Sequence, residues 1–387
     1  MIPSLTHLKE GWRILALSRR RRKAGFTPYL GDAKAICAAI VLHRWNSERC
    51  YYRTGAANFA QFWSRDFGMC AEALIALGHA DKVILTLDYA LERFVRAGKI
   101  TTTITPDGKA YDFPKIASDS LPFIAHALRA AKADDLVQKY LPFLTVEARR
   151  YARIVFDMNT GMVKKNASFS SIKDYAKRSS STYDNSMAFM LSEDLDALEI
   201  PNPLAGQDIA GAMERELWNG KYFFDDMHHY GVVTGDANVF PFWVRAFKGK
   251  KGKKMFTSAL KAIRRAGLDR PFPLKYSSQR NNAHSFILPE LLIKDYESHS
   301  IWMHLGLCFL DVMRQQDPKQ FAHYYGQYTR LIEKHRTFLE VFDSDGSPFK
   351  RTLYICDEGM LWAAKYLALS NIKKNKSSPP QTTKVKP

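Results

Sequence analysis

The sequence predicts an all-α protein, a single-domain (α/α)6 toroid in which six inner helices are wrapped by six outer helices. Segments whose apolar side chains recur with the period of a helix return about a dozen times along the 387 residues. Strand-like alternation of apolar and polar residues is scarce, and no linker divides the periodic region. No internal repeat of about 30 to 45 residues accompanies the helices, which argues against a superhelical repeat protein.

Three regions are expected along the chain. Residues 1–28 form a basic N-terminal extension with helical character, residues 29–371 form the toroid, and residues 372–387 form a disordered basic tail. One short hairpin is expected, because residues 100–105 alternate like a strand and precede the turn sequence Pro106-Asp107-Gly108.

Twelve helices make up the expected toroid, and several of their starts carry capping residues. Asp32 and Asp184 stand at two such starts, and Asp317 stands before Pro318, a residue favoured at the first helical position. In chain order the helices are expected near residues 33–46, 66–78, 80–97, 117–131, 134–157, 184–196, 206–218, 237–247, 254–266, 298–314, 317–338 and 357–370.

The formal net charge of +18 is unusual for a soluble protein, and much of it is local. Basic residues cluster at 19–23, 248–254 and 373–376, and such runs are usually solvated loops or tails outside the fold. A weak contact with an anionic surface or polymer through these runs is a smaller expectation. No nucleic-acid recognition motif accompanies the charge.

The cysteines indicate a reduced, cytoplasmic protein. They are five in number and scattered, without the spacing of a disulfide framework or a zinc site, so no metal and no cofactor is expected. No run of about 18 apolar residues occurs, so no transmembrane segment is expected.

Four short motifs place an aspartate at an expected helix start: Asp66, Asp119, Asp184 and Asp236. Each can act simply as a helix cap. In a helical toroid, however, the four starts would project towards the same end, and their aromatic and polar neighbours suggest a pocket. The neighbours expected to contact a ligand are Trp63, Arg65 and Asn238.

A second candidate group lies in the last hundred residues. Glu340 stands within an apolar run, and Trp302 and Trp362 flank it in the sequence. A carboxylate can activate water at an anomeric carbon, and indole faces stack on a pyranose ring. The alternative is that Glu340 ends a helix before the turn at residues 343–346. Further polar candidates for the same pocket are Tyr296, His299 and Glu358.

These motifs resemble those of the (α/α)6 glycoside hydrolases that include alkaline/neutral invertases, the glucosidase domain of glycogen debranching enzymes, and glucoamylase-like proteins. The W-x-R-D-F motif of the invertases is matched at residues 63–67. Four further motifs are echoed, in the family's order, at residues 118–123, 296–302, 340–343 and 360–364. The resemblance covers residues 60 to 370, nearly the whole folded region.

The resemblance implies a glycosidase that inverts the anomeric configuration, with a carbohydrate substrate. One carboxylic acid protonates the leaving oxygen and a carboxylate activates water. By motif, Asp119 corresponds to the acid and Glu340 to the base, with Asp184 and Glu358 as their rivals. Asp119 is also expected in apolar surroundings, which would favour the protonated form that an acid needs.

The family's pattern is broken at several positions that shape substrate contacts. Residues 297–299, Pro122 and Met360 differ from the family's residues, so its sucrose or maltodextrin specificity does not carry over. Two other functions stay open on the same toroid: a non-catalytic protein that binds carbohydrate or an anionic polymer, and a sugar epimerase or isomerase using histidines. The histidines are not expected to cluster with the acidic motifs, which makes the second of these weaker.

Overall fold

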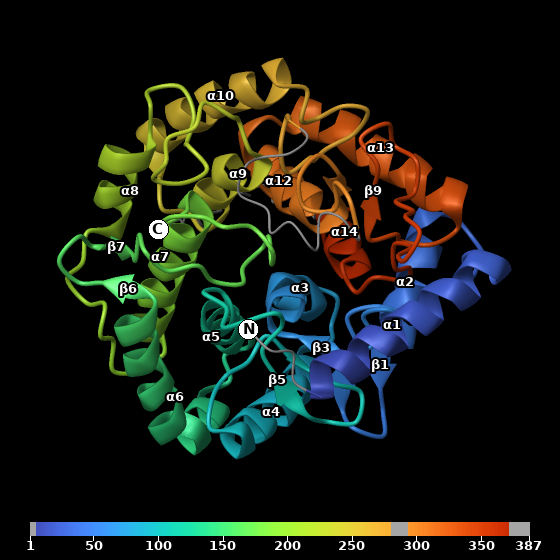
Figure 1. Cartoon of the computed structure of the whole chain (residues 1–387), viewed down its shortest axis with the longest axis horizontal. Coiled ribbons are helices and arrows are strands. Elements are labelled where there is room, and N and C mark those ends of the chain that lie inside the picture. Colours follow the sequence, from blue (N-terminus) through green and yellow to red (C-terminus); the bar gives the residue numbers. More distant parts are fainter. Residues whose placement is uncertain (1–4, 280–292, 371–387) are drawn as a thin grey trace, which may run out of the picture.

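The computed structural model describes residues 5–279 and 293–370, and within them it forms two concentric rings of helices (Figure 1). The inner ring consists of α3 (Ser64–Ala76), α5 (Ser120–Ala131), α7 (Thr182–Ala197), α9 (Gly235–Trp243), α12 (Met303–Gln316) and α14 (Ala363–Ser370). The outer ring consists of α2 (Ala33–Arg44), α4 (Ala80–Ala97), α6 (Asp134–Ile154), α8 (Ile209–Leu217), α10 (Gly249–Arg265) and α13 (Pro318–His335).

The two rings alternate along the chain, which confirms the predicted (α/α)6 toroid. Each inner helix packs on its inner neighbours, and the ring closes where α14 meets α3 and α13 meets α2. All twelve predicted helices are present. The largest differences are at their starts: residues 298–302 and 357–362 are strand and loop, so α12 and α14 begin later than expected.

How much of each helix is buried depends on whether it belongs to the inner or the outer ring. In α5 every residue from Ser120 to Leu128 is buried, because an inner helix is surrounded by other helices. The outer helix α4 buries one face, with Val83, Leu87, Leu91 and Phe94 pointing inwards.

The start of α10 was predicted five residues too late. The run of lysines and glycines at residues 248–254 was expected to be a loop, but α10 begins at Gly249. Gly252, Met255, Phe256 and Ala259 form its buried face, so the lysines are the solvent face of an outer helix.

Short two-stranded ribbons connect the helices. The expected hairpin is present as β4 (Thr103–Ile104) and β5 (Ala110–Tyr111), and β3 (Phe62–Trp63) extends it to three strands. β8 (Ile301–Trp302) pairs with β9 (Val341–Phe342), so Trp302 lies directly opposite Val341. The remaining pairs are β1 (Trp45–Asn46) with β2 (Tyr51–Tyr52), and β6 (Phe156–Asp157) with β7 (Met162–Val163).

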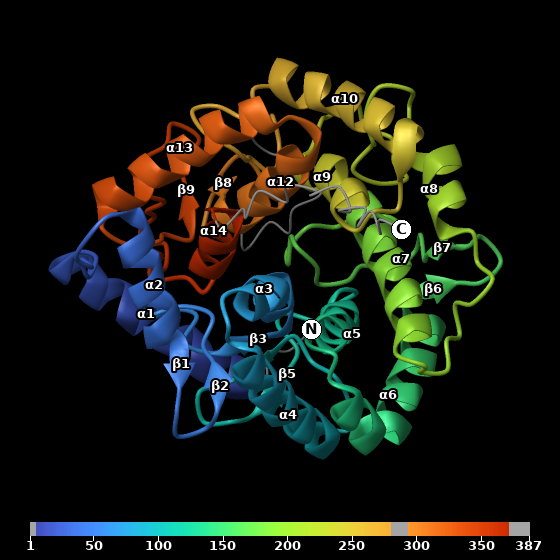
Figure 2. The same cartoon turned by 180° about the vertical axis from the view of Figure 1, so that it is seen from behind.

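The N-terminal segment is the helix α1 (Leu5–Ala24), which lies outside both rings beside α2 and β1 (Figures 1 and 2). None of the described helices combines the length and apolar character that crossing a membrane would require. The tail predicted at residues 372–387 lies outside the described residues.

Close packing between α3 and α5 gives a first testable prediction. A Cβ atom at Gly68 would lie 2.4 Å from the Cβ of Phe123 and 2.8 Å from its carbonyl oxygen. We expect Gly68→Ala to lower the free energy of unfolding by about 1–3 kcal/mol in urea denaturation, because two inner helices must separate.

Gly326→Ala is the matched control, since a Cβ on this α13 glycine would approach only Arg330, at 3.7 Å. This change should raise the free energy of unfolding by about 0.5–1 kcal/mol through helix propensity. Equal effects of the two substitutions would contradict the close inner-ring packing.

Candidate active site

The four helix-start aspartates lie at the same end of the inner ring. Asp119 is the residue before α5, while Asp66, Asp184 and Asp236 are in the first turns of α3, α7 and α9. Side-chain contacts join neighbouring helix starts: Arg65 on α3 reaches Asp119, and Ser118 before α5 reaches Asp184. The expected convergence of the four motifs is therefore what the fold produces.

Asp119 is fully buried and held by a cation. Arg65 Nε lies 2.6 Å from Asp119 Oδ2, and the Tyr183 hydroxyl donates to the same oxygen at 2.8 Å. The other oxygen, Oδ1, has no hydrogen-bond partner among the described residues. The sequence suggested apolar surroundings for Asp119, but the structure places a guanidinium and a hydroxyl group against it.

Asp184 is buried among hydroxyl groups. Ser118 Oγ donates to Asp184 Oδ1 at 2.6 Å, and Ser181 Oγ donates to Oδ2 at 2.7 Å. No Lys, Arg or His of the described residues lies within ion-pair distance of this carboxyl. Burial raises the pKa of Asp184, although Arg178 at longer range and the two hydroxyl groups oppose the rise.

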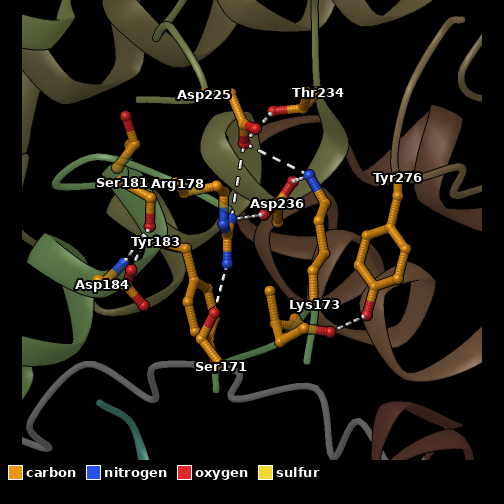
Figure 3. A network of polar contacts seen from close by, with 12 residues as sticks. Ser171, Lys173, Arg178, Ser181, Tyr183, Asp184, Asp225, Thr234, Asp236 and Tyr276 are labelled. Carbon is orange, nitrogen blue, oxygen red and sulfur yellow. Dashed lines mark hydrogen bonds and ion pairs between the residues drawn. The ribbon is translucent and has the colours of Figure 1, made fainter. Parts of the chain in front are cut away.

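Asp236 belongs to a buried ionic cluster that the sequence did not reveal (Figure 3). Lys173 Nζ lies 3.0 Å from its Oδ1 and Arg178 Nη1 lies 2.8 Å from its Oδ2. Asp225 contacts the same two cations at 3.3 and 3.6 Å. This cluster anchors the loop of residues 171–178 over the start of α9, since two carboxylates balance its two cations.

Two of the expected substrate contacts serve the fold instead. The Asn238 side chain is fully buried, and it bonds the backbone of Phe223 and Thr234 at 2.8–3.1 Å. The Trp63 indole donates to Gln61 Oε1 at 3.0 Å and is 4% exposed. Neither side chain has polar atoms left over for a sugar hydroxyl.

Asp66 and Trp362 meet across the closure of the ring. The Trp362 indole nitrogen donates to Asp66 Oδ1 at 3.0 Å, joining α14 to α3. Burial raises the pKa of Asp66 to about 7, although the neighbouring Arg65 lowers it.

Glu340 stands before β9, fully buried in a cradle of three donors. The Tyr296 hydroxyl donates to Oε1, the Tyr354 hydroxyl donates to Oε2 at 2.7 Å, and the backbone amide of Asp357 donates to Oε2 at 2.6 Å. Burial raises the pKa of Glu340 to about 7 against these hydrogen bonds. The residue does not end a helix, because residues 336–340 connect α13 to β9.

Trp302 shares this region with a histidine that the sequence analysis missed. The Trp302 indole donates to the carbonyl oxygen of Tyr296 at 2.8 Å, and its ring packs at 5.0 Å from the ring of His304. His304 also lies 4.7 Å from the Trp362 ring, and burial lowers its pKa well below the usual value. His299 instead contacts the Ser277 carbonyl at 3.2 Å.

Two further carboxyls join the Asp119 and Glu340 regions. Asp174 Oδ1 pairs with Arg65 at 3.1 Å, and the backbone amides of Asp174 and Tyr175 each donate to Glu297 at 2.8 Å. Burial and the nearby Asp174 raise the pKa of Glu297 to about 8. Glu297 is among residues 297–299, at which the sequence departs from the motif it resembles.

Comparison with known proteins identifies solved structures that share this fold. No protein-family model and no curated protein matches the sequence. Among solved structures, the GH63 mannosylglycerate hydrolase of Thermus thermophilus has a TM-score of 0.62 at 11% identity, covering 87% of this chain and 99% of that one. A rhamnosidase from Klebsiella oxytoca has a TM-score of 0.61 at 11% identity, covering 88% of this chain and 64% of that one.

The neutral trehalase of Saccharomyces cerevisiae has a TM-score of 0.55 at 11% identity, covering 82% of this chain and 72% of that one. The fold is therefore the six-hairpin toroid of glycosidases. The nearer resemblance to invertases, debranching enzymes and glucoamylase-like proteins stays a prediction.

No group of His, Cys, Asp or Glu suited to a metal ion occurs in the described part of the chain.

Glu358, the rival base, is held by the N-terminal segment, through Thr27 and through Arg21 of α1. Thr27 donates its backbone amide to Glu358 Oε2 at 2.6 Å, and Arg21 Nε lies 3.3 Å from Oε1. Burial raises the pKa of Glu358, while Arg21 lowers it.

The sequence suggested that the N-terminal basic run is solvated, but Arg21 within it is buried. It is 6% exposed, pairs with Asp357 at 3.1 Å, and donates to the Cys356 carbonyl at 3.0 Å. Asp357 in turn donates its amide to Glu340. The helix α1 thus supports the loop that carries one wall of the Glu340 cradle.

This anchoring gives the second prediction. Arg21→Ala leaves Asp357 and Glu358 buried without their cation, so the free energy of unfolding should fall by about 3–5 kcal/mol in chemical denaturation. Arg20→Ala removes an exposed arginine of the same run and should change it by less than about 0.5 kcal/mol. Similar small effects of both changes would mean that α1 does not support the site.

Proposed function

We propose that the chain is a glycoside hydrolase that cleaves an exposed glycosidic bond of an oligosaccharide or small glycoside with inversion at the anomeric carbon. The observation that carries the proposal is a pair of buried carboxyls with raised pKa values, Glu340 and Asp184, at the site end of a glycosidase toroid. Two carboxyls with separate environments are what inverting hydrolysis needs.

Glu340 is proposed as the general base. With a pKa of about 7, Glu340 is a stronger base than an ordinary glutamate. It is still ionised above neutral pH, and a base that takes a proton from water must be ionised. The Tyr296 and Tyr354 hydroxyls fix the orientation of the carboxylate. Oε2 accepts from Tyr354 and from the Asp357 amide, whereas Oε1 accepts from Tyr296 alone and keeps a lone pair that can accept a proton from water.

Asp184 is proposed as the general acid in place of Asp119. Asp119 Oδ2 is occupied by Arg65 at 2.6 Å and by the Tyr183 hydroxyl at 2.8 Å, so this carboxyl is tied into the scaffold of the site. Asp184 has two serine hydroxyls as neighbours and a raised pKa, so it fits the role better. Asp119 is then a positioning residue, which fixes Arg65 and Tyr183 at the starts of α3 and α7.

The remaining candidates form the packed wall of the site. Trp302 and Trp362 are 7% and 2% exposed and both pack on His304, and the Trp362 indole donates to Asp66. The structural neighbours are named for mannosylglycerate, rhamnose and trehalose chemistry, so the toroid itself selects no particular sugar. A panel of aryl α- and β-glycosides is the appropriate first screen.

The third prediction tests the assignment of the two carboxyls. Asp184→Asn and Glu340→Gln should each lower turnover by at least about 10²-fold, because each removes a proton-transferring group. Substrates with activated leaving groups need little protonation, so they should partly rescue Asp184→Asn and not Glu340→Gln. Proton NMR should show that the first-released sugar has the opposite anomeric configuration to the substrate.

Two further variants make this test decisive. Asp81→Asn alters an exposed helix-start aspartate of the outer helix α4 and should leave turnover unchanged. Rescue of Asp119→Asn instead of Asp184→Asn would return the acid to Asp119. Unchanged turnover in both the Asp184 and Glu340 variants would contradict the proposed pair and favour the alternative of a non-catalytic carbohydrate-binding protein.

The fourth prediction uses pH. The Tyr354 hydroxyl stabilises the ionised form of Glu340, so Tyr354→Phe should raise the pKa of this carboxyl further. Since the base must be ionised, the acidic limb of the kcat/KM profile should move to higher pH by about one unit.

Tyr140→Phe is the control for this experiment. Tyr140 also donates to a carboxylate, Asp88, at 2.6 Å, but the pair lies on the outer helices α6 and α4. Loss of the Tyr140 hydroxyl should leave the acidic limb of the kcat/KM profile at the same pH. A limb that stays fixed in Tyr354→Phe, or moves to lower pH, would exclude Glu340 as its source.

One observation favours a second candidate, a sugar epimerase or isomerase. His304 lies between the Trp302 and Trp362 rings and its Nε2 is 3.1 Å from the Tyr276 hydroxyl, so a histidine does share the site. Analysis of the sugar products distinguishes the two reactions: hydrolysis separates the glycone from its aglycone, whereas isomerisation leaves the bond intact and converts the sugar.

A further inference from the structure

A polar cavity opens towards the other end of the same inner helices. It has a volume of about 240 Å³ and is lined by residues from the later turns of α3, α5, α7 and α12 and the end of α9. The aspartates of the candidate active site stand at the starts of four of these helices, and along α5 the rise from Asp119 to His126 is about 10 Å.

The cavity contains a buried imidazole that makes no hydrogen bond. His126 is 7% exposed, and neither of its ring nitrogens has a hydrogen-bond partner among residues 5–279 and 293–370, although Nε2 lies 3.8 Å from Glu72 Oε1. Asp194 is fully buried beside it, with Oδ2 3.5 Å from His126 Nδ1 and Oδ1 2.6 Å from Arg129. A buried polar side chain without a hydrogen bond is costly, so the His126 imidazole calls for a ligand or ordered water.

An aromatic wall completes the cavity. The Trp243 indole donates to Asp311 Oδ2 at 3.2 Å, and Lys365 Nζ lies 5.2 Å from its ring centre. The ring centres of His126 and Trp243 are 5.9 Å apart, so the unpartnered imidazole stands beside the indole. A fixed indole next to charged hydrogen-bonding groups is suited to an apolar sugar face with hydroxyls around its edge.

The charges of the lining select against a charged ligand. Four carboxylates and four Lys or Arg side chains face the cavity, so a single positive or negative charge on the ligand gains no net attraction. A hydroxyl both donates and accepts, and it can therefore satisfy carboxylates, guanidinium groups and an imidazole together. The volume lies below the range of about 300–1,000 Å³ that is usual for drug-sized ligands, which indicates a single small ring.

We propose that this cavity is a second binding site, for a neutral monosaccharide or cyclic polyol, formed by His126, Arg129, Asp194 and Trp243. The site is separate from the carboxyls of the candidate active site and requires no turnover. Its occupant would donate hydroxyl protons to Asp194, accept from Arg129, bond His126, and stack on the indole.

The test measures binding of D-glucose, D-mannose and myo-inositol to the full chain by calorimetry and ligand-observed NMR. At least one should bind with a Kd of about 1–10 mM, and His126→Ala and Asp194→Asn should each weaken it at least about 10-fold. Glu340→Gln, at the other end of the ring, should leave this binding unchanged. The control His335→Ala changes a half-buried histidine of α13 and should also have no effect.

Arg314→Ala keeps the test available if the interior variants fail to fold, because Arg314 lines the cavity with its side chain 33% exposed. It too should weaken binding. The proposal is overturned if none of the three probes binds, or if Glu340→Gln abolishes binding while His126→Ala retains it. Saturable binding of glycine betaine without binding of the polyols would identify a zwitterion site and overturn the assigned ligand class.

Discussion

The arrangement of the candidate active site depends on the buried ion pair between Arg65 and Asp119. Arg65 is 8% exposed and pairs with both Asp119 and Asp174, so one guanidinium joins the starts of α3 and α5 to the loop that crosses over them. A buried charge is tolerated only when its partners are fixed. The backbone amide of Asp174 then holds Glu297, beside the tyrosine that bonds Glu340.

The same burial has a cost for the folded protein. Burial raises the pKa values of Asp66 and Glu340 to about 7 and that of Glu297 to about 8. The folded chain therefore binds protons that the unfolded chain releases near pH 4, so these three groups reduce stability as the pH rises from about 4 to about 8. Carboxyls with perturbed pKa values of this kind cluster at functional sites in proteins.

The fold followed from local patterns, whereas much of the site did not. Apolar periodicity and helix caps are local, so twelve helices and the common end of Asp66, Asp119, Asp184 and Asp236 were predictable. Lys173, Asp174 and Arg178 sit in a loop without periodicity, and their partners are far along the chain. Which of the four aspartates Arg65 reaches also depends on the folded geometry, because Arg65 and Asp119 are 54 residues apart in the sequence.

Occupancy of the polar cavity should stabilise the ring more than it changes the active site. The inner helices are packed on every side, and from Asp119 to His126 α5 rises only about 10 Å. Binding at the cavity can change binding at the active site only if some structural element has two conformations and each ligand favours one of them. Close contacts such as Gly68 against Phe123 leave little room for the inner helices to shift. A ligand that binds only the folded state therefore acts mainly by mass action on unfolding, which would offset part of the stability lost to the buried carboxyls.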